Sequence, residues 1–318
     1  EKNNPGSADL IVHRVVHGGT KYRHAALLDL EVKQFIRDMI PLARTHHPAS
    51  LACIEEISEH FPEIPQAVVF DTSFHQTLPE YAWRYALPRK ISDQYAIRRY
   101  GFHGISHQSV VKQAASFLKT PVNKLNLITI HLGNGASISA IKKGICVDTT
   151  MGMTPLEGLV MGTRPGDLDP GILTLLARKG WNQEALETML NQDSGMKGLC
   201  GTNDFREILQ NKEEGNEEAE MALELYCYRV RKTIGSYGTV IGPVDALVFT
   251  GGVGENVPSV RKRSVRGMEW MNIQLDPDMN DHAEAPCAIH SKDSQTKILV
   301  LPSNEEWEMA SQAAELIL

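Results

Sequence analysis

Cysteine is scarce in this sequence, and basic residues are outnumbered by acidic ones. The five cysteines (Cys53, Cys146, Cys200, Cys227 and Cys287) are scattered and form no C-x-x-C pair, so neither a disulfide framework nor a zinc knuckle is indicated. The 32 Lys and Arg residues against 39 Asp and Glu give a formal charge of -7. This balance argues against a nucleic-acid binder that relies on a general basic field. We expect reduced cysteines and no nucleic-acid partner.

Long apolar runs and several common phosphate motifs are also missing. No run approaches the roughly 18 apolar residues of a membrane helix, so we expect no membrane association and a cytoplasmic location. The 318 residues contain no Gly-Lys dipeptide, which excludes the G-x-x-x-x-G-K-[ST] loop. Gly133-Asn134-Gly135 begins like a Rossmann fingerprint but Ile138 replaces its third glycine. His17-Gly18-Gly19 lacks the G-x-S-x-G partner of an esterase.

Apolar runs alternate with helical patterns, which is typical of an α/β protein. Four segments read as a buried strand followed by a loop of small or polar residues: 66–75, 125–135, 245–256 and 297–306. Helical spacing predicts helices over 30–43 and 217–235. The Gly- and Pro-rich stretch 144–172 reads as a long ordered loop. Ligands in open α/β sheets bind beyond the carboxyl ends of the strands, so the four loops predict a site built from distant segments.

Two glycine-rich loops follow apolar strands. HLGNG (131–135) and GGVGEN (251–256) would let backbone N–H groups approach a phosphate or a nucleotide without interference from a Cβ. Either loop alone could be a tight turn. The two together favour a nucleotide site.

Two arginines stand in unusual settings. Arg14 lies inside an apolar strand, where it would face a cleft or make a structural ion pair. Arg164 lies beside Asp167 and Asp169, either of which could pair with it in a turn. Both arginines are therefore candidates for binding an anion, with a structural ion pair as the alternative.

Carboxylates and histidines supply further candidates. Asp71 ends a strand, and Glu305 begins a helix, where it could simply complement the helix dipole. His103 and His107 are spaced for one helical face, but no third metal ligand is near in sequence, so we expect no zinc site.

Eight segments together resemble the acetate kinases in order and approximate spacing. They are HRVVHGG (13–19), FDTSFH (70–75), RRYGFHGISH (98–107), HLGNGAS (131–137), DTTMGMTPLEGL (148–159), GTRPGDLDPG (162–171), FTGGVGEN (249–256) and NEE (304–306). The resemblance covers essentially the whole chain. It implies an α/β fold of two related ribonuclease H-like, actin-type ATPase domains with a nucleotide cleft between them. Domain I, on the acetate side, would be 1–72 plus 305–318, and domain II, which binds nucleotide and dimerises, would be 73–304.

The family pattern also begins with a strand and an Asn-x-Gly-Ser-Ser-Ser phosphate loop, neither of which this sequence contains. We therefore expect domain I to be incomplete at its N-terminus. On that expectation the 318-residue chain binds ATP but phosphorylates acetate poorly. Two other positions depart from the pattern: Thr45 stands at an apolar wall of the acetate pocket, and Pro165 stands where Ser or Cys is usual.

The resemblance implies transfer of the ATP γ-phosphoryl group to acetate, reversibly and in line. The matching catalytic residues are Asp71, His103 and Arg164. The matching acetate-binding residues are Arg14, Val16, Phe102 and Pro155. The matching nucleotide-binding residues are His131, Leu132, Gly133, Asn134, Gly135, Asp204, Phe205, Arg206, Gly251, Gly252, Val253, Gly254, Glu255 and Asn256.

Glu305 matches the glutamate associated with Mg²⁺, for which Mn²⁺ is an alternative. The implied partners are acetate, ATP or ADP, and a second copy of the chain in a homodimer. A propionate or other short-chain acyl kinase is the alternative enzyme, because one methylene in an apolar pocket discriminates by only about 1–3 kcal/mol. A nucleotide-binding fragment without full activity is the alternative outside enzymes.

Overall fold

The computed structural model describes residues 8–44 and 46–318. The substitution expected at Thr45 and the first seven residues of the expected domain I lie outside these ranges. The chain divides into two compact units, one made of residues up to 109 together with 304–318, the other of 110–303. The sequence placed the first boundary at 72. Residues 73–108 belong to the first unit because their loops bond to its strand ends, as when the Gly104 N–H donates to the Asp71 carbonyl at 2.9 Å.

The first unit contains a three-stranded sheet in the order β1-β3-β2. Its strands are β1 (Ile11–Val15), β2 (Ala26–Leu27) and β3 (Gln66–Phe70). β1 and β3 are parallel, with Arg14 beside Val69, and β2 pairs antiparallel with β3. All five residues of β3 are buried, and the four after Gln66 are apolar, as is typical of a strand covered on both faces.

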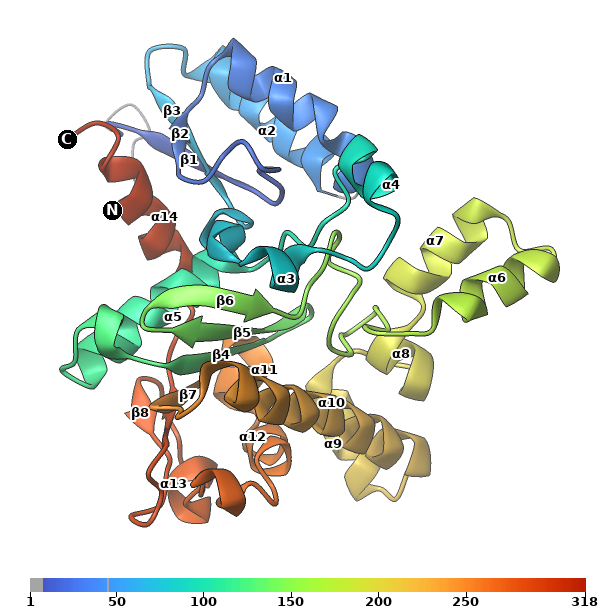
Figure 1. Cartoon of the computed structure of the whole chain (residues 1–318), viewed down its shortest axis with the longest axis vertical. Helices are drawn as coiled ribbons and strands as arrows, with labels where there is room; N and C mark the ends of the chain where they lie inside the picture. Colours follow the sequence, from blue (N-terminus) through green and yellow to red (C-terminus); the bar gives the residue numbers. More distant parts are fainter. Residues whose placement is uncertain (1–7, 45) are drawn as a thin grey trace. The chain divides into compact units, whose positions relative to one another are not determined.

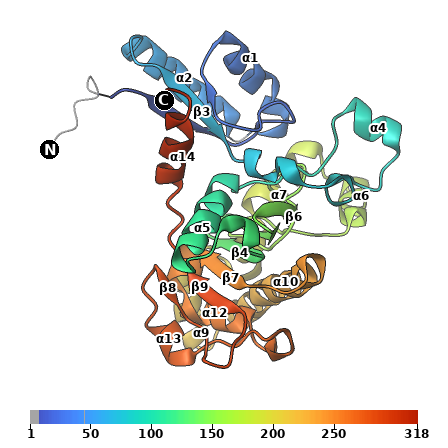
Figure 2. The ribbon, with the colours of Figure 1, turned by 60° about the vertical axis from the view of Figure 1, so that its left-hand side comes forward.

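The first unit also contains several helices. They are α1 (Leu30–Asp38), α2 (His47–His60), α3 (Glu80–Trp83), α4 (Arg89–Gln94), the start of α5 (Gly104–Phe117) and α14 (Glu305–Ala314), with 3-10 turns η2 (Ile40–Leu42) and η3 (Ser73–Thr77). α1 and α2 lie side by side (Figure 1), and α14 lies against β1 and β3 (Figure 2). The helix expected over 30–43 ends at Asp38, and Pro41, which has no N–H to donate, lies in the 3-10 turn that follows.

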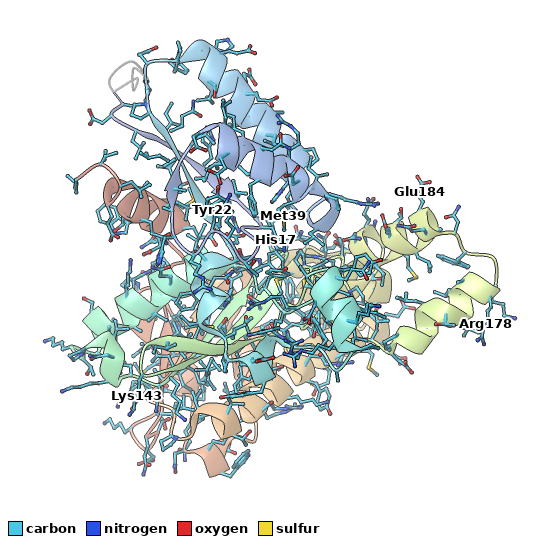
Figure 3. The ribbon with its side chains drawn as sticks, turned by 45° about the horizontal axis from the view of Figure 1, so that its top comes forward. His17, Tyr22, Met39, Lys143, Arg178 and Glu184 are labelled. Carbon is cyan, nitrogen blue, oxygen red and sulfur yellow. The ribbon has the colours of Figure 1, made fainter. Side chains whose placement is uncertain are left out.

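The core of the first unit lies between the sheet and α1 and α2. It consists of Val15, Val32, Ile36, Leu51, Ile54, Val68 and Phe70. The Tyr22 ring stacks on Phe70 at 4.9 Å between ring centroids. Tyr22, His17 and Met39 lie near one another just beyond the end of β1 (Figure 3). The loop after β1 is therefore anchored in the core of the unit.

The second unit contains a six-stranded sheet in the order β6-β5-β4-β7-β9-β8. Its strands are β4 (Leu127–Leu132), β5 (Ala136–Lys142), β6 (Ile145–Thr149), β7 (Ala246–Thr250), β8 (Cys287–Ala288) and β9 (Lys297–Val300). β4, β7 and β9 are parallel, and β5, β6 and β8 run antiparallel to their neighbours. The strands expected within 66–75, 125–135, 245–256 and 297–306 are all present, as β3, β4, β7 and β9. β6 lies within the stretch 144–172 that the sequence predicted to be a loop.

The helices of this unit are α6 (Pro170–Arg178), α7 (Gln183–Gln192), α8 (Gly195–Cys200), α9 (Phe205–Glu213), α10 (Glu217–Ile241), α11 (Gly251–Asn256), α12 (Pro258–Ser264) and α13 (Pro277–Asp281), with 3-10 turns η4 (Val122–Lys124) and η5 (Glu269–Met271). α10 packs on β5 and contacts α8, α9 and α12. It begins at the N-cap Asn216 and ends at Gly242 (φ 82°), so it is longer than the predicted helix 217–235. GGVGEN forms the helix α11 and not the loop that the sequence predicted.

Candidate active site

In the first unit an arginine and two carboxylates meet at the ends of β1, β3 and the β9–α14 connection. The Arg14 guanidinium donates from Nε to Asp71 Oδ1 (3.0 Å) and from Nη2 to Asp71 Oδ2 (2.8 Å). Its Nη1 donates to Glu305 Oε2 at 3.2 Å. Asp71 is 2% exposed, whereas the Arg14 side chain is 38% exposed, so the pair is buried on its carboxylate side. The structural ion pair that was the alternative for Arg14 is therefore present.

The charges of this group depend on one another. Asp71 raises the pKa of Arg14 above its ordinary value, so the guanidinium stays charged. Burial raises the pKa of the Asp71 carboxyl, and Arg14 opposes that rise. Burial likewise raises the pKa of Glu305, against the opposing effect of Arg14.

One carboxylate oxygen of Glu305 makes no hydrogen bond within the described part of the chain. Its Oε1 is buried and has no hydrogen-bond partner, whereas Oε2 is held by Arg14. A buried, unpaired carboxylate oxygen is costly unless a ligand satisfies it. Oxygen donors of this kind suit Mg²⁺, which takes few protein ligands and keeps several waters. No cluster of three His, Cys, Asp or Glu side chains suited to a metal occurs among residues 8–44 and 46–318. Glu305 thus fits a metal that is bound mainly by other ligands.

His103 sits at a strained position beside this group. Its φ is 56°, in the left-handed region that non-glycine residues rarely occupy and that clusters at functional sites. The next residue, Gly104, starts α5 so close to β3 that a Cβ there would lie 2.2 Å from the Asp71 carbonyl oxygen. This contact fixes His103 relative to Asp71. His107, one turn later, is buried and packs edge-on to His75, with 5.7 Å between ring centroids.

The loop after β1 is held by histidine and threonine side chains. The backbone N–H groups of His17 and Gly18 donate to His47 Nε2 (3.2 Å) and Thr72 Oγ1 (2.9 Å). Val16 is partly buried at the start of this loop, and the buried Phe102 packs edge-on to His17 with 5.6 Å between ring centroids. Val16 and Phe102 therefore lie in one unit, whereas Pro155, the third expected pocket residue, lies in the other.

In the second unit, Asn134 of HLGNG contacts the predicted segment that begins at Gly162 and also Asn203, the residue just before the predicted segment 204–206. The Gly162 N–H donates to the Asn134 carbonyl at 2.9 Å, and Asn203 Nδ2 donates to Asn134 Oδ1 at 2.9 Å. Within HLGNG, the Gly133 N–H donates to the Gly135 carbonyl at 2.8 Å and closes a tight turn. HLGNG therefore forms a tight turn and also contacts segments that are distant from it in the sequence.

Arg164 differs from Arg14 in having no carboxylate partner. Its Nη1 donates to the Pro155 carbonyl at 2.6 Å, and no Asp or Glu of the described chain lies within ion-pair distance. The two carboxylates considered for it are engaged elsewhere: Asp167 accepts from the Gly158 N–H, and Asp169 caps α6. Burial alone lowers the pKa of Arg164 from its ordinary value. Because the guanidinium is partly buried and unneutralised, it is suited to bind an anion.

The segment 204–206 has a clear structural role. Asp204 caps α9 by accepting from the Arg206 N–H at 2.9 Å. The Arg206 guanidinium, with a side chain 92% exposed, pairs with Asp204 and lowers the pKa of that carboxyl to about 2. Phe205 is buried and packs edge-on to Tyr226 at 5.1 Å between ring centroids. The first turn of α9 is therefore capped and packed beside Asn203, a residue that the motifs did not indicate.

α11 continues this edge of the second sheet. Gly251 has φ 78°, and a Cβ there would lie 2.7 Å from the Leu132 carbonyl oxygen, so α11 sits directly against HLGNG. The Glu255 carboxylate turns back to its own helix and accepts from the Gly251 N–H at 2.9 Å. The predicted residues therefore form two groups, one in each unit. The first holds Arg14, Val16, Asp71, Phe102, His103 and Glu305, and the second holds Pro155, Arg164 and the three nucleotide segments.

Comparison with known proteins decides the family. The profile described as the acetokinase family matches residues 2–311. The chain belongs to the acetokinase family. The predicted resemblance is confirmed, and membership makes the chain a phosphotransferase with a carboxyl group as acceptor.

Individual relatives agree. The acetate kinase of Sulfurovum sp. is 51% identical over 308 residues, which are 96% of this chain and 78% of that protein. The acetate kinase of Syntrophobacter fumaroxidans is 48% identical over 98% of this chain and 77% of its own length.

Two solved structures share the fold. The acetate kinase of Porphyromonas gingivalis superposes with a TM-score of 0.94 at 41% identity, over 99% of this chain and 80% of that one. A propionate kinase from Francisella tularensis gives 0.92 at 42% identity, over 96% and 78%. The predicted two-domain α/β fold of the family is thereby confirmed. Among the described residues, no helix combines the length and apolar character needed to cross a bilayer.

Proposed function

We propose that this acetokinase transfers the γ-phosphoryl group of ATP directly to acetate, giving acetyl phosphate and ADP, and catalyses the reverse reaction. An acetate oxygen forms the new P–O bond, the bond from the γ-phosphorus to the β–γ bridging oxygen breaks, and its electron pair leaves on ADP. The observation that carries the proposal is the partly buried Arg164 guanidinium, which no carboxylate among residues 8–44 and 46–318 neutralises.

The difficulty of this reaction is charge and not nucleophilicity. Carboxylates are ionised at pH 7, so no general base is needed to create the attacking oxygen. An anion must instead approach a polyanionic phosphoryl group. Positioning and electrostatic stabilisation should therefore supply most of the rate.

The roles of the charged residues follow from their partners. Arg164 would bind the equatorial oxygens of the transferring phosphoryl group, for which a guanidinium fork is suited. Asp71 has both oxygens on Arg14 and would orient that arginine toward the acetate carboxylate. His103, held in place by the Gly104–Asp71 junction, would donate to the same transition state. Val16, Phe102 and Pro155 would enclose the acetate methyl group.

We assign nucleotide binding to His131–Gly135, Asp204–Arg206 and Gly251–Asn256 in the second unit. The contacts of Asn134 with Gly162 and Asn203, and the close approach of Gly251 to Leu132, support a single site for these segments. Their glycines leave backbone N–H groups accessible to phosphate oxygens.

Glu305 would hold Mg²⁺, with Mn²⁺ as an alternative, through its unpartnered Oε1. The metal would supply charge neutralisation at the nucleotide phosphates. Glu305→Gln keeps the size of the side chain but removes its charge, so the Mg²⁺ concentration for half-maximal activity should rise about tenfold. An unchanged magnesium titration would place the metal elsewhere.

A rate comparison tests the acceptor. ATP consumption and trapping of the acyl phosphate as a hydroxamate would be measured with acetate, propionate and butyrate. We expect the highest kcat/KM with acetate. The similarity to the Francisella propionate kinase keeps propionate as the second candidate, and a higher kcat/KM for propionate would establish it. ATP binding without any acyl phosphate would support the non-enzymatic alternative.

Stereochemistry tests the direct transfer. ATP made chiral at the γ-phosphorus should give acetyl phosphate with inverted configuration, because one in-line displacement inverts the centre. Net retention would require a phosphorylated enzyme intermediate and would exclude the proposed single step.

We also propose that the enzyme is a cytoplasmic homodimer that associates through the second unit. Apolar side chains remain exposed on the α6–α7 hairpin, including Ile172 (46%) and Leu175 (54%). Arg178 and Glu184 on the same hairpin point outward (Figure 3) and provide charges of both signs. Leu175→Glu should convert a dimer to a monomer in light scattering, and an unchanged mass would exclude this surface.

A further inference from the structure

Arg261 on α12 is a fully buried arginine that meets no carboxylate. It is 0% exposed, and its Nε and Nη2 donate to the side-chain and backbone oxygens of Asn280 at 2.9 and 2.8 Å. Its Nη1 donates to the carbonyls of Gly254 (3.0 Å) and Glu255 (2.8 Å). Throughout the described part of the chain, no Asp or Glu lies within ion-pair distance of it. A buried charge is costly, so the backbone oxygens that it binds must compensate for the lost water.

The two carbonyls belong to the end of α11, where the helix cannot satisfy them itself. The residue four positions after Gly254 is Pro258, which has no N–H to donate. The guanidinium supplies the missing donor, at the end of the helix where the dipole favours a cation.

α11 needs such support. It has six residues, three of them glycine, and glycine costs about 1 kcal/mol each relative to alanine within a helix. Its other end is closed by the Glu255 carboxylate, which accepts from the N–H groups of Gly251 (2.9 Å) and Ser303 (3.2 Å). A short, weak helix is thus held between a carboxylate at its start and a guanidinium at its end.

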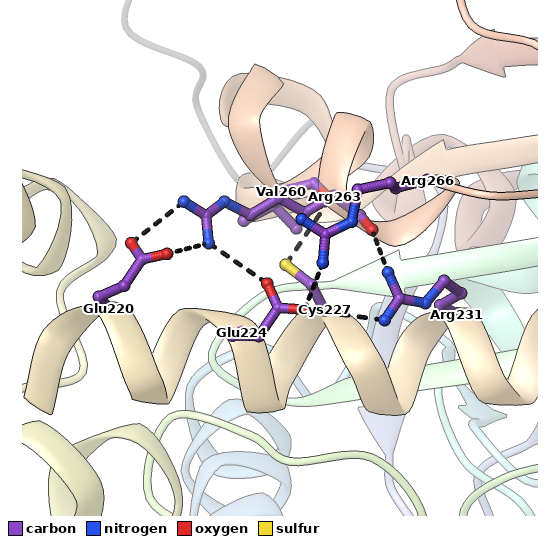
Figure 4. Close-up of polar contacts among 7 residues, drawn as sticks. All are labelled: Glu220, Glu224, Cys227, Arg231, Val260, Arg263 and Arg266. Atoms are coloured by element: carbon purple, nitrogen blue, oxygen red, sulfur yellow. Dashed lines mark hydrogen bonds and ion pairs between the residues drawn. The ribbon is translucent and has the colours of Figure 1, made fainter. Parts of the chain in front are cut away.

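α12, which carries Arg261, is itself clamped to α10 (Figure 4). Arg263 donates to Glu220 at 2.7 and 3.1 Å, and Arg266 donates to Glu224 at 2.6 Å. These pairs fix α12 from the side facing α10. Arg261 takes no part in this clamp and contacts α11 instead.

We propose that Arg261 is a positioning residue for the nucleotide, because it fixes the backbone of Gly254 and Glu255 and thereby the segment 251–256. The proposal rests on the function proposed above, in which this segment binds ATP and ADP. Arg261 itself does not touch the nucleotide and acts through the backbone that it holds.

Three substitutions separate the contributions. Arg261→Lys keeps the charge but loses the planar fork that reaches two carbonyls and Asn280 together. Arg263→Met is the matched control, since Arg263 lies on the same helix and the substitution removes its pair with Glu220 on α10 without touching α11. Gly252→Val probes the nucleotide contact, because a Cβ at Gly252 meets no protein atom within 4 Å. ADP binding would be measured by calorimetry, and the urea midpoint of each 318-residue variant would be determined beside it.

The ADP Kd of Arg261→Lys should rise about tenfold, while its KM for acetate changes by less than about twofold. Arg263→Met should lower the urea midpoint and leave the ADP Kd within about twofold of the parent. If Arg261→Lys does not fold, Asn280→Ala, which removes one anchor of the guanidinium, should give the same selective loss of ADP affinity.

Other outcomes contradict the proposal in distinguishable ways. If Gly252→Val weakens ADP binding and Arg261→Lys does not, Arg261 has no positioning role and the nucleotide site stands. If Arg261→Lys and Arg263→Met weaken ADP binding equally, the effect is general loosening of α12. If Gly252→Val leaves ADP binding unchanged, the segment 251–256 does not bind nucleotide. The assignment of this segment to the nucleotide site and the role of Arg261 then both fail.

Discussion

Arg14 and Arg164 carry the same charge in different surroundings. Arg14 is held by Asp71 and Glu305, whereas the partner of the Arg164 guanidinium among the described residues is the Pro155 carbonyl. Removing Arg14 would leave the nearly buried Asp71 carboxylate unpaired. Removing Arg164 would leave no carboxylate of the described chain unpaired. The two arginines should therefore contribute differently to stability even if both are needed for catalysis.

We predict that Arg14→Met lowers both stability and activity. The free energy of unfolding should fall by about 1–3 kcal/mol, less than for a fully buried pair because the Arg14 side chain is 38% exposed. Urea unfolding followed by circular dichroism would measure the loss. Arg37→Met, which breaks the exposed pair with Glu55 at 3.0 Å, is the control and should change stability by less than about 0.5 kcal/mol. Equal losses in the two variants would show that burial of Asp71 does not matter.

At the level of the elements, the junction between β3 and α5 brings His103 beside Asp71. Its tightest point is Gly104, where a Cβ would lie 2.2 Å from a backbone oxygen that cannot move aside freely. Gly104→Ala should therefore destabilise the chain by about 1–3 kcal/mol and reduce kcat by shifting His103.

Gly235→Ala is the matched control for this prediction. Gly235 lies within α10, and a Cβ there meets no atom within 4 Å. Alanine should stabilise the helix by about 0.5–1 kcal/mol and leave kcat unchanged. Thermal unfolding of both variants would show opposite signs. A stable, fully active Gly104→Ala variant would mean that this junction does not position His103.

The strands were the most predictable elements. Residues 67–70 and 246–249 are buried and apolar, and an unbroken apolar run of this kind is typical of a strand covered on both faces. Helix α11 was not predictable, because three glycines in six residues read as a loop, and its contacts with Arg261 and Glu255 depend on the folded chain. β6 was missed because its five residues are interrupted by Asp148 and lie in a Gly- and Pro-rich stretch.

The stability of the whole chain should depend on pH through buried histidines. Burial lowers the pKa of His75 from 6.5 to about 4, and the pKa values of His13 and His47 are lowered by the same cause. His47 accepts the His17 N–H on Nε2, an arrangement that requires the neutral ring. Below pH 6.5 these histidines are therefore protonated in the unfolded chain but stay largely neutral in the folded chain. The free energy of unfolding falls as the pH falls toward 4.

Protonation of His75 in the unfolded chain should alone lower the free energy of unfolding by about 2 kcal/mol between pH 7 and pH 5. Urea unfolding at both pH values would measure the difference. His75→Gln keeps a donor for the Phe102 carbonyl but cannot titrate, so its loss over the same range should be smaller by that amount. A loss as large as that of the parent chain would show that His75 is not responsible.

At the scale of the molecule, motifs predicted which residues belong to the site but not how they are held. The resemblance selected Arg14, Asp71 and Glu305, and the structure brings these three together. Nothing in the sequence indicated that Asn134 would join segments near 162 and 203, or that Arg261 would bind α11, because these contacts depend on the folded path of the backbone. The family assignment is confirmed, whereas the role of each residue stays a prediction.

The most direct test of the account is phosphorus NMR of ATP and acetate incubated with the parent chain and, in parallel, with Arg164→Met. We predict that acetyl phosphate and ADP appear together with the parent chain. The variant should form them at least about 10²-fold more slowly, because it lacks a contact that strengthens in the transition state. Its urea midpoint should match that of the parent, since no carboxylate pairs with Arg164. No acetyl phosphate from the parent chain, or equal rates from the two proteins, would contradict the account.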